Sequence, residues 1–452
     1  MYNLWLWIKD RRNRLWVFPM VTALLAVGLA FVAKWVGSFW MADGLPDIQT
    51  ETIDDLLTVI ATSMLAVATF SLGILVSALS SSATNATPRA TELLMGDDDT
   101  RGVIGIFMAS FTYSVVAKTA LDVGYYDGPG RFVLFVSTLA VLAYVVFRLL
   151  LWVKTLSNLG RMSDTVARIE RVSRTALKAH AKRPTLGAGA APQEAPRGTA
   201  IRAEDIGYLR HLDMSGLQEA ACEADCTLHL HVRPGSFVGP DTVLATASRH
   251  KVPMNMGGVN SNEPPPAPAA KAVRDCFLLG PARSYDQDPR FGLIVLSEVA
   301  LRALSPAVND PGTAISVMVS LTTLVVQADR ALTEKKAEAK ADEADKADTD
   351  TVDTDEGKSE GIEFDRLTLP ALDIRTLVAD GFAPIARDSA SMLEVSVRLQ
   401  KMLATIARNG SAPVALEARL QARRATERGM VALTHPDDRR QLEATHEALF
   451  SA

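Results

Sequence analysis

Four apolar stretches before residue 153 constrain this chain more than any other feature. Each approaches the ~20 residues that a helix needs to cross a hydrocarbon core, and they cover Leu15–Ala33, Leu56–Ala78, Val103–Ala120 and Phe132–Val153. The remainder of the 452 residues has the composition of soluble protein. This distribution excludes a wholly soluble enzyme, a collagen-like or disordered chain and a disulfide scaffold, and it predicts an integral membrane protein.

The first stretch resembles a signal peptide in length, but its end does not. Cleavage after Ala33 would place the bulky Phe31 where a small residue is required, so we expect a retained helix. The third stretch is short and contains Lys118 near its end, where a long side chain can reach the headgroups. We therefore expect four transmembrane helices.

The charges that flank the spans predict their orientation. The segment before the first span and the segment after the fourth are rich in Lys and Arg. The loops Met41–Asp55 and Leu121–Gly130 carry acidic residues and neither Lys nor Arg. Because basic flanks stay on the cytoplasmic side, both termini are expected in the cytoplasm.

The second span carries a stripe of small and hydroxyl residues at intervals of three and four. Its members are Thr58, Thr62, Ala66, Thr69, Gly73, Ser77 and Ser80. Small residues let two helices approach closely, so one interpretation is helix packing. The other is a pore lining, since hydroxyls and exposed backbone can face water in an oligomeric channel.

Beyond the spans, the expected segments follow from periodicity and composition. Residues 154–183 have the apolar spacing of an amphipathic helix, and 184–200 are rich in Ala, Gly and Pro, as in a linker. Residues 201–250 predict a small β-containing unit with strands at Cys226–Val232, Phe237-Val238 and Thr242–Ala247. The hairpin resembles biotinyl and lipoyl carrier domains but lacks their modifiable lysine.

Four residues of this unit invite a metal interpretation: Cys222, Cys226, His229 and His231. The Cys-x3-Cys spacing is unusual for a zinc site, and no second pair follows at a familiar interval. We therefore expect no metal and no cofactor. Three cysteines in a cytoplasmic region also predict no disulfide.

Residues 270–330 hold the densest local pattern, expected to form two helices joined by an Asn-Asp-Pro turn. Its polar residues are Arg283, Asp286, Asp288, Glu298, Asn309 and Asp310. Asp310 before Pro311 is typical of a helix start, which makes capping one interpretation and a cation or ligand site the other. The apolar run Ala314–Val326 is too short to span a bilayer, so we expect a buried core helix.

These motifs resemble an uncharacterised family of predicted bacterial membrane proteins, domain of unknown function 2254. The resemblance rests on Asp288-Pro-x-Phe-Gly-Leu, on Ala-Leu-Ser-Pro-x-x-Asn-Asp-Pro-x-Thr-Ala ending at Ala314, and on the Arg-Pro-Gly-Ser-Phe-Val turn ending at Val238. It covers roughly Arg12–Val326, and more weakly the last ninety residues. The resemblance implies an inner-membrane protein with a cytoplasmic domain, and it supplies no catalytic residues.

The last two segments are 331–361 and 362–452. Thr333–Glu360 has 11 acidic and 5 basic residues with a single large apolar residue, which predicts a disordered insertion. The C-terminal segment predicts helices over Leu367–Asn409, interrupted near Gly381–Pro384, then over Pro413–Ala432 and Pro436–Leu449. Outside the acidic segment the charges nearly balance, which gives no indication of nucleic-acid binding.

The expected fold is a membrane domain of four transmembrane helices in residues 1–153, followed by a cytoplasmic α+β region. That region has a small β-hairpin unit and a mainly helical C-terminal part. Phosphate-binding, dinucleotide-binding, zinc-protease and nucleophile-elbow motifs are absent from the sequence, so we do not expect an enzyme. The leading hypothesis is a homo-oligomeric channel-like or transport protein with a regulatory cytoplasmic domain. The alternative is a non-conducting scaffold or sensor that binds a protein or small ligand.

Overall fold

The computed structural model divides the chain into two units, Met1–Thr165 and Val166–Ala452. The structure describes four isolated positions between 21 and 28 and, beyond them, residues 48–85, 87–90, 98–156, 161–194, 196–249, 268–347 and 362–450. Apart from the isolated positions, the first predicted span, Leu15–Ala33, lies outside the described residues. The segments predicted after residue 165 all belong to one compact unit rather than to separate domains.

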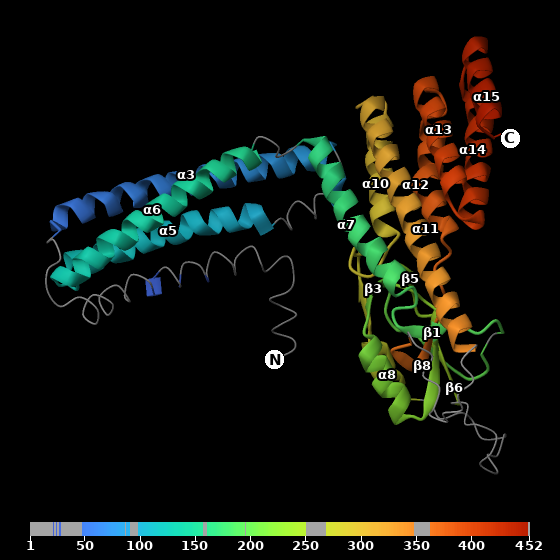
Figure 1. Cartoon of the computed structure of the whole chain (residues 1–452), viewed down its shortest axis with the longest axis horizontal. Coiled ribbons are helices and arrows are strands. Elements are labelled where there is room, and N and C mark those ends of the chain that lie inside the picture. Colours follow the sequence, from blue (N-terminus) through green and yellow to red (C-terminus); the bar gives the residue numbers. More distant parts are fainter. Residues whose placement is uncertain are drawn as a thin grey trace. The chain divides into compact units, whose positions relative to one another are not determined.

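Three long helices form most of the described part of the first unit. They are α3 (Thr50–Asn85), α5 (Asp98–Asp122) and α6 (Gly128–Leu156), and they contain the last three predicted spans. Helix α3 packs along α5, and α6 contacts both (Figure 1). One buried cluster includes Tyr113 and Leu134, and a second includes Phe107 and Trp152. Apolar side chains therefore join the three helices at two levels.

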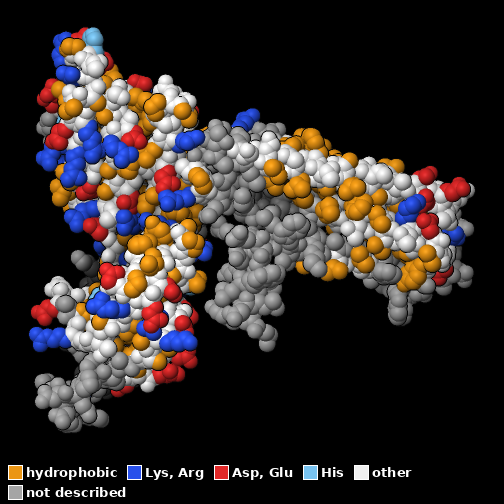
Figure 2. Space-filling model, turned by 180° about the vertical axis from the view of Figure 1, so that it is seen from behind, with side chains coloured by type: hydrophobic (Ala, Val, Ile, Leu, Met, Phe, Trp, Pro, Cys, Tyr) orange, Lys and Arg blue, Asp and Glu red, His pale blue; other side chains and the backbone are white. Residues whose placement is uncertain are grey.

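The outer surface of these helices is also apolar. Phe70 is 67% exposed, and Phe147 and Leu150 are similarly open. Figure 2 shows hydrophobic side chains along the visible face, with charged side chains at the end where α3 begins and α5 ends. An apolar surface of this extent is unfavourable in water and suits a lipid environment. By length and composition, four described helices can cross a membrane: Thr50–Ala78, Gly102–Asp122, Gly128–Leu156 and Pro311–Glu338.

The last of these four differs from our expectation. It lies in α11 (Pro311–Ala347), whose 37 residues extend well beyond the apolar run that we judged too short. The helix packs against α10 (Phe291–Leu304), α12 (Arg375–Asp388) and α13 (Leu393–Asn409). Its most apolar window is 44% buried, a larger share than in the other three helices. Its packing is that of a core helix, although its length and composition also fit a span.

Several polar side chains inside the membrane unit have partners within it. The Trp152 indole N–H donates to the Ser71 hydroxyl at 2.9 Å, and the Tyr113 hydroxyl lies 2.9 Å from that of Ser137. Lys118, near the end of α5, forms an ion pair with Asp54 at the start of α3. A charge in a span is costly unless it is paired, so this contact explains how Lys118 is accommodated.

The second unit contains two small sheets. The five-stranded sheet has the order β1-β8-β4-β6-β2, and the three-stranded sheet has the order β5-β3-β7. Strand β8 runs parallel to β1 and β4, whereas the other pairs are antiparallel. The strands are β1 (Ala188–Ala190), β2 (Thr199–Arg202), β3 (Gly207–Leu212), β4 (Cys226–Leu230), β5 (Phe237–Val238), β6 (Val243–Arg249), β7 (Phe277–Gly280) and β8 (Phe364–Leu369).

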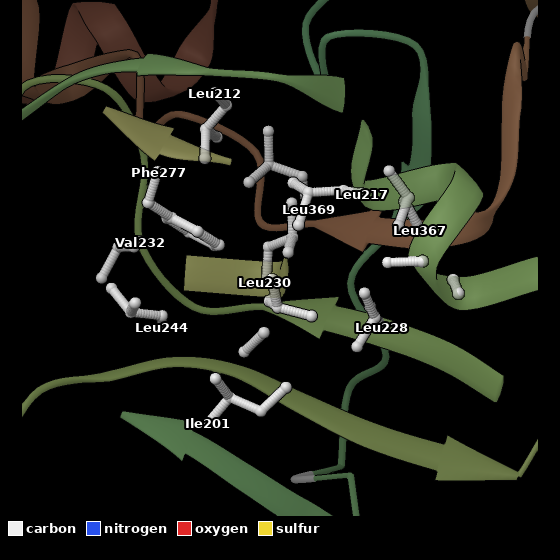
Figure 3. Packing of buried hydrophobic residues seen from close by; sticks show 14 of the residues in the cluster. Ile201, Leu212, Leu217, Leu228, Leu230, Val232, Leu244, Phe277, Leu367 and Leu369 are labelled. Atoms are coloured by element: carbon white, nitrogen blue, oxygen red, sulfur yellow. The ribbon is translucent and has the colours of Figure 1, made fainter. Parts of the chain in front are cut away.

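One face of the larger sheet builds a hydrophobic core (Figure 3). On β4, Leu228 and Leu230 are buried while Thr227 and His229 are half-buried, which confirms the predicted alternation. Helix α8 (Met214–Glu223) contributes Leu217 to this core and packs against β4 and β8. The short helix α9 (Ala270–Asp275) connects to β7.

The remaining helices of this unit are α7 (Met162–Lys182), α10, α11, α12, α13, α14 (Ala412–Ala432) and α15 (Pro436–Phe450). Helix α10 packs against α11 and α12, while α13 packs against α14 and α15 (Figure 1). The predicted helices at α7, α10, α14 and α15 are present, and α11 begins at Pro311 as expected. The unit is thus mostly helical, with β4 at the centre of its larger sheet and β3 at the centre of the smaller one.

Three predicted boundaries differ from the structure. The expected linker at 184–200 contains β1 and the first two residues of β2. These short strands form because they pair with β8 and β6, which are distant in sequence. The expected helix from Leu367 is strand β8 up to Leu369, and α12 begins only at Arg375. The predicted interruption at Gly381–Pro384 is absent, since α12 runs through Pro384 and ends at Asp388. Buried Phe382 and Ile385 on either side of Pro384 hold this stretch in the helix.

The acidic segment also differs in its first half. Helix α11 continues through Thr333 to Ala347, where Ala, Glu and Lys predominate and favour helix. Pairs one turn apart support it, with Arg330 beside Glu334 and Lys335 beside Glu338. The sequence prediction considered only the lack of a core and overlooked this local helix propensity. Residues 348–361 lie outside the described residues.

Candidate functional site

The small-residue stripe lies on the exposed side of α3. All seven of its residues, Thr58, Thr62, Ala66, Thr69, Gly73, Ser77 and Ser80, are exposed within the described part of the chain. The residues of α3 that pack against α5 and α6 recur on the opposite side and include Ile53, Leu57, Ile60, Met64 and Ala68. The stripe therefore takes no part in the packing of the three described membrane helices.

Two hydroxyls of the stripe, those of Thr62 and Thr69, are satisfied by the helix itself. Thr62 donates to the carbonyl of Thr58 at 2.9 Å, and Thr69 donates to the carbonyl of Ala66 at 2.9 Å. A Cβ built on Gly73 would meet no described atom within 4 Å. Each threonine oxygen keeps lone pairs that can accept hydrogen bonds from water, as a pore lining requires. Because the hydroxyl hydrogen is already donated to the helix backbone, the same residues can also pack against another helix without water. The geometry thus admits both interpretations made from the sequence.

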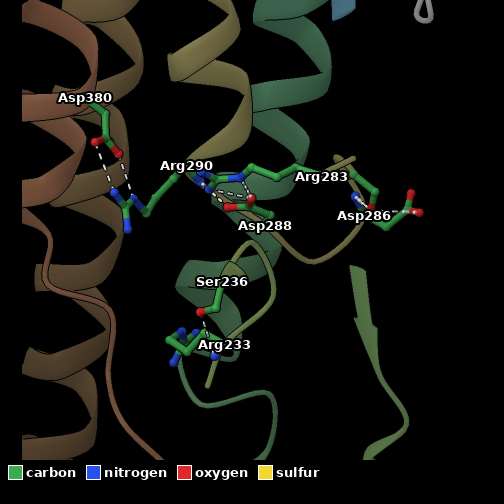
Figure 4. A network of polar contacts seen from close by, with 8 residues as sticks. Arg233, Ser236, Arg283, Asp286, Asp288, Arg290 and Asp380 are labelled. Atoms are coloured by element: carbon green, nitrogen blue, oxygen red, sulfur yellow. Dashed lines mark hydrogen bonds and ion pairs between the residues drawn. The ribbon is translucent and has the colours of Figure 1, made fainter. Parts of the chain in front are cut away.

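The signature residues gather in the loop before α10, around a buried carboxylate. Asp288 is 2% exposed, and its Oδ2 accepts from Arg283 Nε at 2.7 Å and Nη2 at 2.6 Å (Figure 4). Its Oδ1 accepts from the backbone N–H of Arg290 at 3.1 Å. Burial raises the pKa of Asp288, whereas the Arg283 guanidinium acts in the opposite direction. The Arg283 guanidinium also lies over the Phe291 ring, 5.7 Å from its centroid.

The Arg233-Pro-Gly-Ser turn lies against this ion pair. Gly235 has a φ of +92°, and a Cβ on it would lie 2.2 Å from Asp288 Oδ2. Only glycine satisfies both constraints. Arg233 donates to the carbonyls of Pro184, at 2.8 Å, and Pro370. Burial lowers the pKa of Arg233 to about 10, with Asp288 opposing that shift. The turn thus joins the end of α7, the end of β8 and the loop before α10.

A second ion pair links the same loop to α12. Arg290 Nε donates to Asp380 Oδ2 at 2.7 Å, and its Nη2 donates to Oδ1 at 3.0 Å. This fork geometry is the strong form of an Arg–carboxylate contact. The sequence analysis did not identify Arg233, Arg290 or Asp380. Arg233 lies in a turn that we quoted only as part of the family resemblance, and Asp380 has no local motif around it.

The other signature residues do not join this cluster. Asp286 is exposed, with its Oδ2 3.5 Å from the Ser284 hydroxyl. Glu298 lies midway along α10 and is half-buried. Asn309, at a φ of +48°, and Asp310 follow the far end of α10, whose 14 residues make ~20 Å of helix. One small ligand therefore cannot contact both Asp288 and Asp310.

Asp310 caps α11. Its Oδ1 accepts from the backbone N–H of Thr313 at 2.9 Å, and its Oδ2 accepts from the Thr313 hydroxyl at 2.6 Å. These two contacts lower the pKa of Asp310 and keep the carboxylate charged at the start of the helix. The capping interpretation thus accounts for the Asn-Asp-Pro turn, and the ligand interpretation has no contact to support it at this end of α10.

His229 and His231 lie on the sheet face opposite Leu228 and Leu230, beside hydroxyls. The ring nitrogens of His229 are 2.9 Å from Thr368 Oγ1 and 2.8 Å from Ser248 Oγ, and His231 Nε2 is 2.7 Å from Thr246 Oγ1. Among the described residues, no three His, Cys, Asp or Glu side chains gather closely enough to hold a metal ion. Burial and the neighbouring His231 lower the pKa of His229.

Long apolar helices with a lipid-compatible outer surface, followed by a mostly helical α/β unit, define this chain as a membrane protein. It belongs to the predicted membrane protein family of domain of unknown function 2254, whose model matches residues 12–405. The match confirms the resemblance, runs through the acidic segment and ends at residue 405. No solved structure matches the chain.

Curated relatives cover only part of the chain. Uncharacterised proteins of Mycobacterium bovis and Mycobacterium tuberculosis are each 34% identical to it over 136 residues. That alignment spans 29% of this chain and 24% of each relative. The chain therefore spans about a quarter of the length of the curated relatives that it matches.

Proposed function

We propose that this protein is a homo-oligomeric, channel-like or transport protein of the bacterial inner membrane, with the α3 stripe facing the centre of the assembly. One observation carries the proposal: the stripe lies on the side of α3 opposite its packing face. A face of small and hydroxyl residues makes poor contact with lipid tails, whereas it suits a symmetric contact or a water-filled path. The proposal assigns the protein transport rather than catalysis.

In this proposal the second unit is a cytoplasmic regulatory domain, and both termini are cytoplasmic. The basic flanks and acid-rich loops support that orientation. A cysteine placed at exposed Val123, in the α5–α6 loop, should react with an impermeant reagent applied to intact cells. A cysteine at exposed Gln193 should not, in a background where the exposed Cys222 is replaced by serine. Labelling at Gln193 before lysis would contradict the orientation.

The alternative is a non-conducting scaffold or sensor, and one observation favours it. Thr62 and Thr69 donate their hydroxyl hydrogens to their own helix, so a dry helix contact leaves no donor unpaired. In that case the stripe packs against another helix, and the cytoplasmic unit binds a protein or small ligand.

A pair of variants separates the two functions. Gly73→Leu adds a large side chain within the stripe, and Ser63→Leu adds one at an exposed position on the same helix but off the stripe. For a channel, Gly73→Leu should assemble normally and conduct less in planar bilayers, while Ser63→Leu conducts like the wild type. For a scaffold, Gly73→Leu should separate the subunits, since the glycine permits close approach. A wild-type protein that stays monomeric in lipid discs would contradict the channel.

A further inference from the structure

The solvent face of α7 carries a row of basic side chains. Arg171, Lys178 and Lys182 are exposed, and their spacing of seven and four residues places them on one side of the helix. The opposite side is buried, with Ile169 and Leu177 among its residues. We call Arg171, Lys178 and Lys182 the basic row.

Contacts on its inner side hold α7 firmly within the second unit. Ser173 packs so closely against α10 that a Cβ on Gly292 would lie 1.8 Å from its hydroxyl oxygen. Glu170 accepts from Arg174 through Oε1, and through Oε2 from Ser320 of α11 at 2.7 Å. The two carboxylate oxygens of Glu170 are therefore both engaged away from the basic row. The helix cannot turn to bury the row without breaking these contacts.

The charge of the row is not neutralised within the described chain. Arg161–Arg183 contains seven basic and two acidic residues. Of these two, Glu170 is engaged as above, and Asp164 lies in the first turn of α7. Arg171, Lys178 and Lys182 form no ion pair with any described residue. The row is thus an exposed cationic surface without an anionic counterpart among the residues that the structure describes.

We propose that the basic row binds the headgroups of anionic phospholipids in the bilayer that the protein crosses. Helix α6 ends at Leu156 and α7 begins at Met162. The five intervening residues can extend at most roughly 20 Å, so covalent connection keeps the start of α7 near the end of a span. Clustered Lys and Arg directly after a transmembrane helix attract anionic lipid. The row has the charge for this partner, and its first member, Arg171, follows the end of α6 by 15 residues.

The size of the effect follows from the number of charges. Each basic side chain near an anionic surface strengthens binding to it roughly fivefold. Three such side chains together should therefore strengthen binding by roughly a hundredfold at low ionic strength. Added salt should weaken the binding, because the side chains are exposed and screened. This inference holds whether or not the protein conducts ions.

The test uses the full-length protein in mild detergent, titrated with phosphatidylglycerol or phosphatidylcholine and examined by native mass spectrometry. The test variant combines Arg171→Gln, Lys178→Gln and Lys182→Gln. The matched control combines Arg398→Gln, Lys401→Gln and Arg408→Gln, which removes the same charge from exposed positions on α13. Thermal unfolding of both variants checks that the fold is intact.

We expect the wild type and the control to retain phosphatidylglycerol in preference to phosphatidylcholine. The test variant should lose that preference by roughly a hundredfold at low salt, with phosphatidylcholine binding unchanged. Equal phosphatidylglycerol binding by the test variant and the wild type would overturn the proposal. Full competition by millimolar inorganic phosphate would assign the row to a soluble anion instead. Binding of duplex RNA that the test variant alone loses, without any lipid preference, would assign it to nucleic acid.

Discussion

At the scale of single residues, Asp288 links the loop before α10 to the Arg233–Ser236 turn of the second unit. Its carboxylate is paired with Arg283, bonded to the backbone before α10 and covered by the Gly235 turn. A buried carboxylate is stable only when its charge and lone pairs are satisfied, and here three contacts do so. The signature Asp-Pro-x-Phe-Gly therefore has a structural explanation that requires no ligand.

Asp288→Asn should destabilise the second unit by about 3 kcal/mol. The amide keeps the shape of the carboxylate but leaves the largely buried Arg283 charge without its partner. The control Asp286→Asn changes an exposed neighbour and should alter stability by less than about 0.5 kcal/mol. The thermal unfolding midpoint of the detergent-solubilised protein measures both. Identical midpoints for the two variants would contradict the role given to Asp288.

His180 should make stability depend on pH. Burial, with a smaller effect of the nearby Arg233 guanidinium, lowers the pKa of His180 to about 4. The unfolded state, with an ordinary histidine pKa near 6.5, binds more protons between these values, so stability falls as pH falls from about 6.5 towards 4. Across this whole pH range, the free energy of unfolding should change by about 3 kcal/mol.

His180→Gln tests this dependence. The free energy of unfolding, measured as the pH is lowered from 7 to 5, should fall less steeply in the variant than in the wild type. The control His435→Gln removes an exposed histidine and should keep the slope of the wild type. A variant slope equal to that of the wild type would show that His180 does not titrate as described.

At the scale of elements, the contact between α7 and α10 depends on two small residues. Gly292→Ala would bring its Cβ to 1.8 Å from the Ser173 hydroxyl and 2.6 Å from the Ser173 Cβ. Overpacking of this kind costs about 1–3 kcal/mol. The second change Ser173→Gly removes both clashing atoms, so the double variant should be more stable than the sum of the single changes predicts. If the two changes in stability were instead additive in a double-mutant cycle, the clash would be relieved by the two helices moving apart, and the predicted contact between these residues would be contradicted.

Elements with a strong local period were predictable from the sequence, and those that depend on distant partners were not. The three described spans, β4, α10 and the Pro311 start of α11 each carry their own signal in apolar spacing or capping. Strand β8 gains its structure from parallel pairing with β4, far away in the sequence, and nothing in Phe364–Leu369 indicates that partner. For the same reason, the ion pair between Arg290 and Asp380 could be identified only from the structure, because the two residues lie far apart in the sequence.

At the scale of the whole molecule, the α3 stripe is the feature on which the functional account depends. Sequence periodicity identified its members, but periodicity alone could not tell which side of α3 packs against the other helices. The structure places that side opposite the stripe. A helix with one face used within the subunit and one small-residue face left over is suited to assembly.

The most direct test measures whether water reaches the stripe in the assembled protein. Thr69→Cys lies on the stripe, and Leu72→Cys lies on the same helix at an exposed position off it. In proteoliposomes, in a background without the native cysteines, a small water-soluble thiol reagent should modify Thr69→Cys rapidly and alter conductance. Leu72→Cys, facing lipid, should react far more slowly. A Thr69→Cys protein that assembles but reacts no faster than Leu72→Cys would contradict the channel.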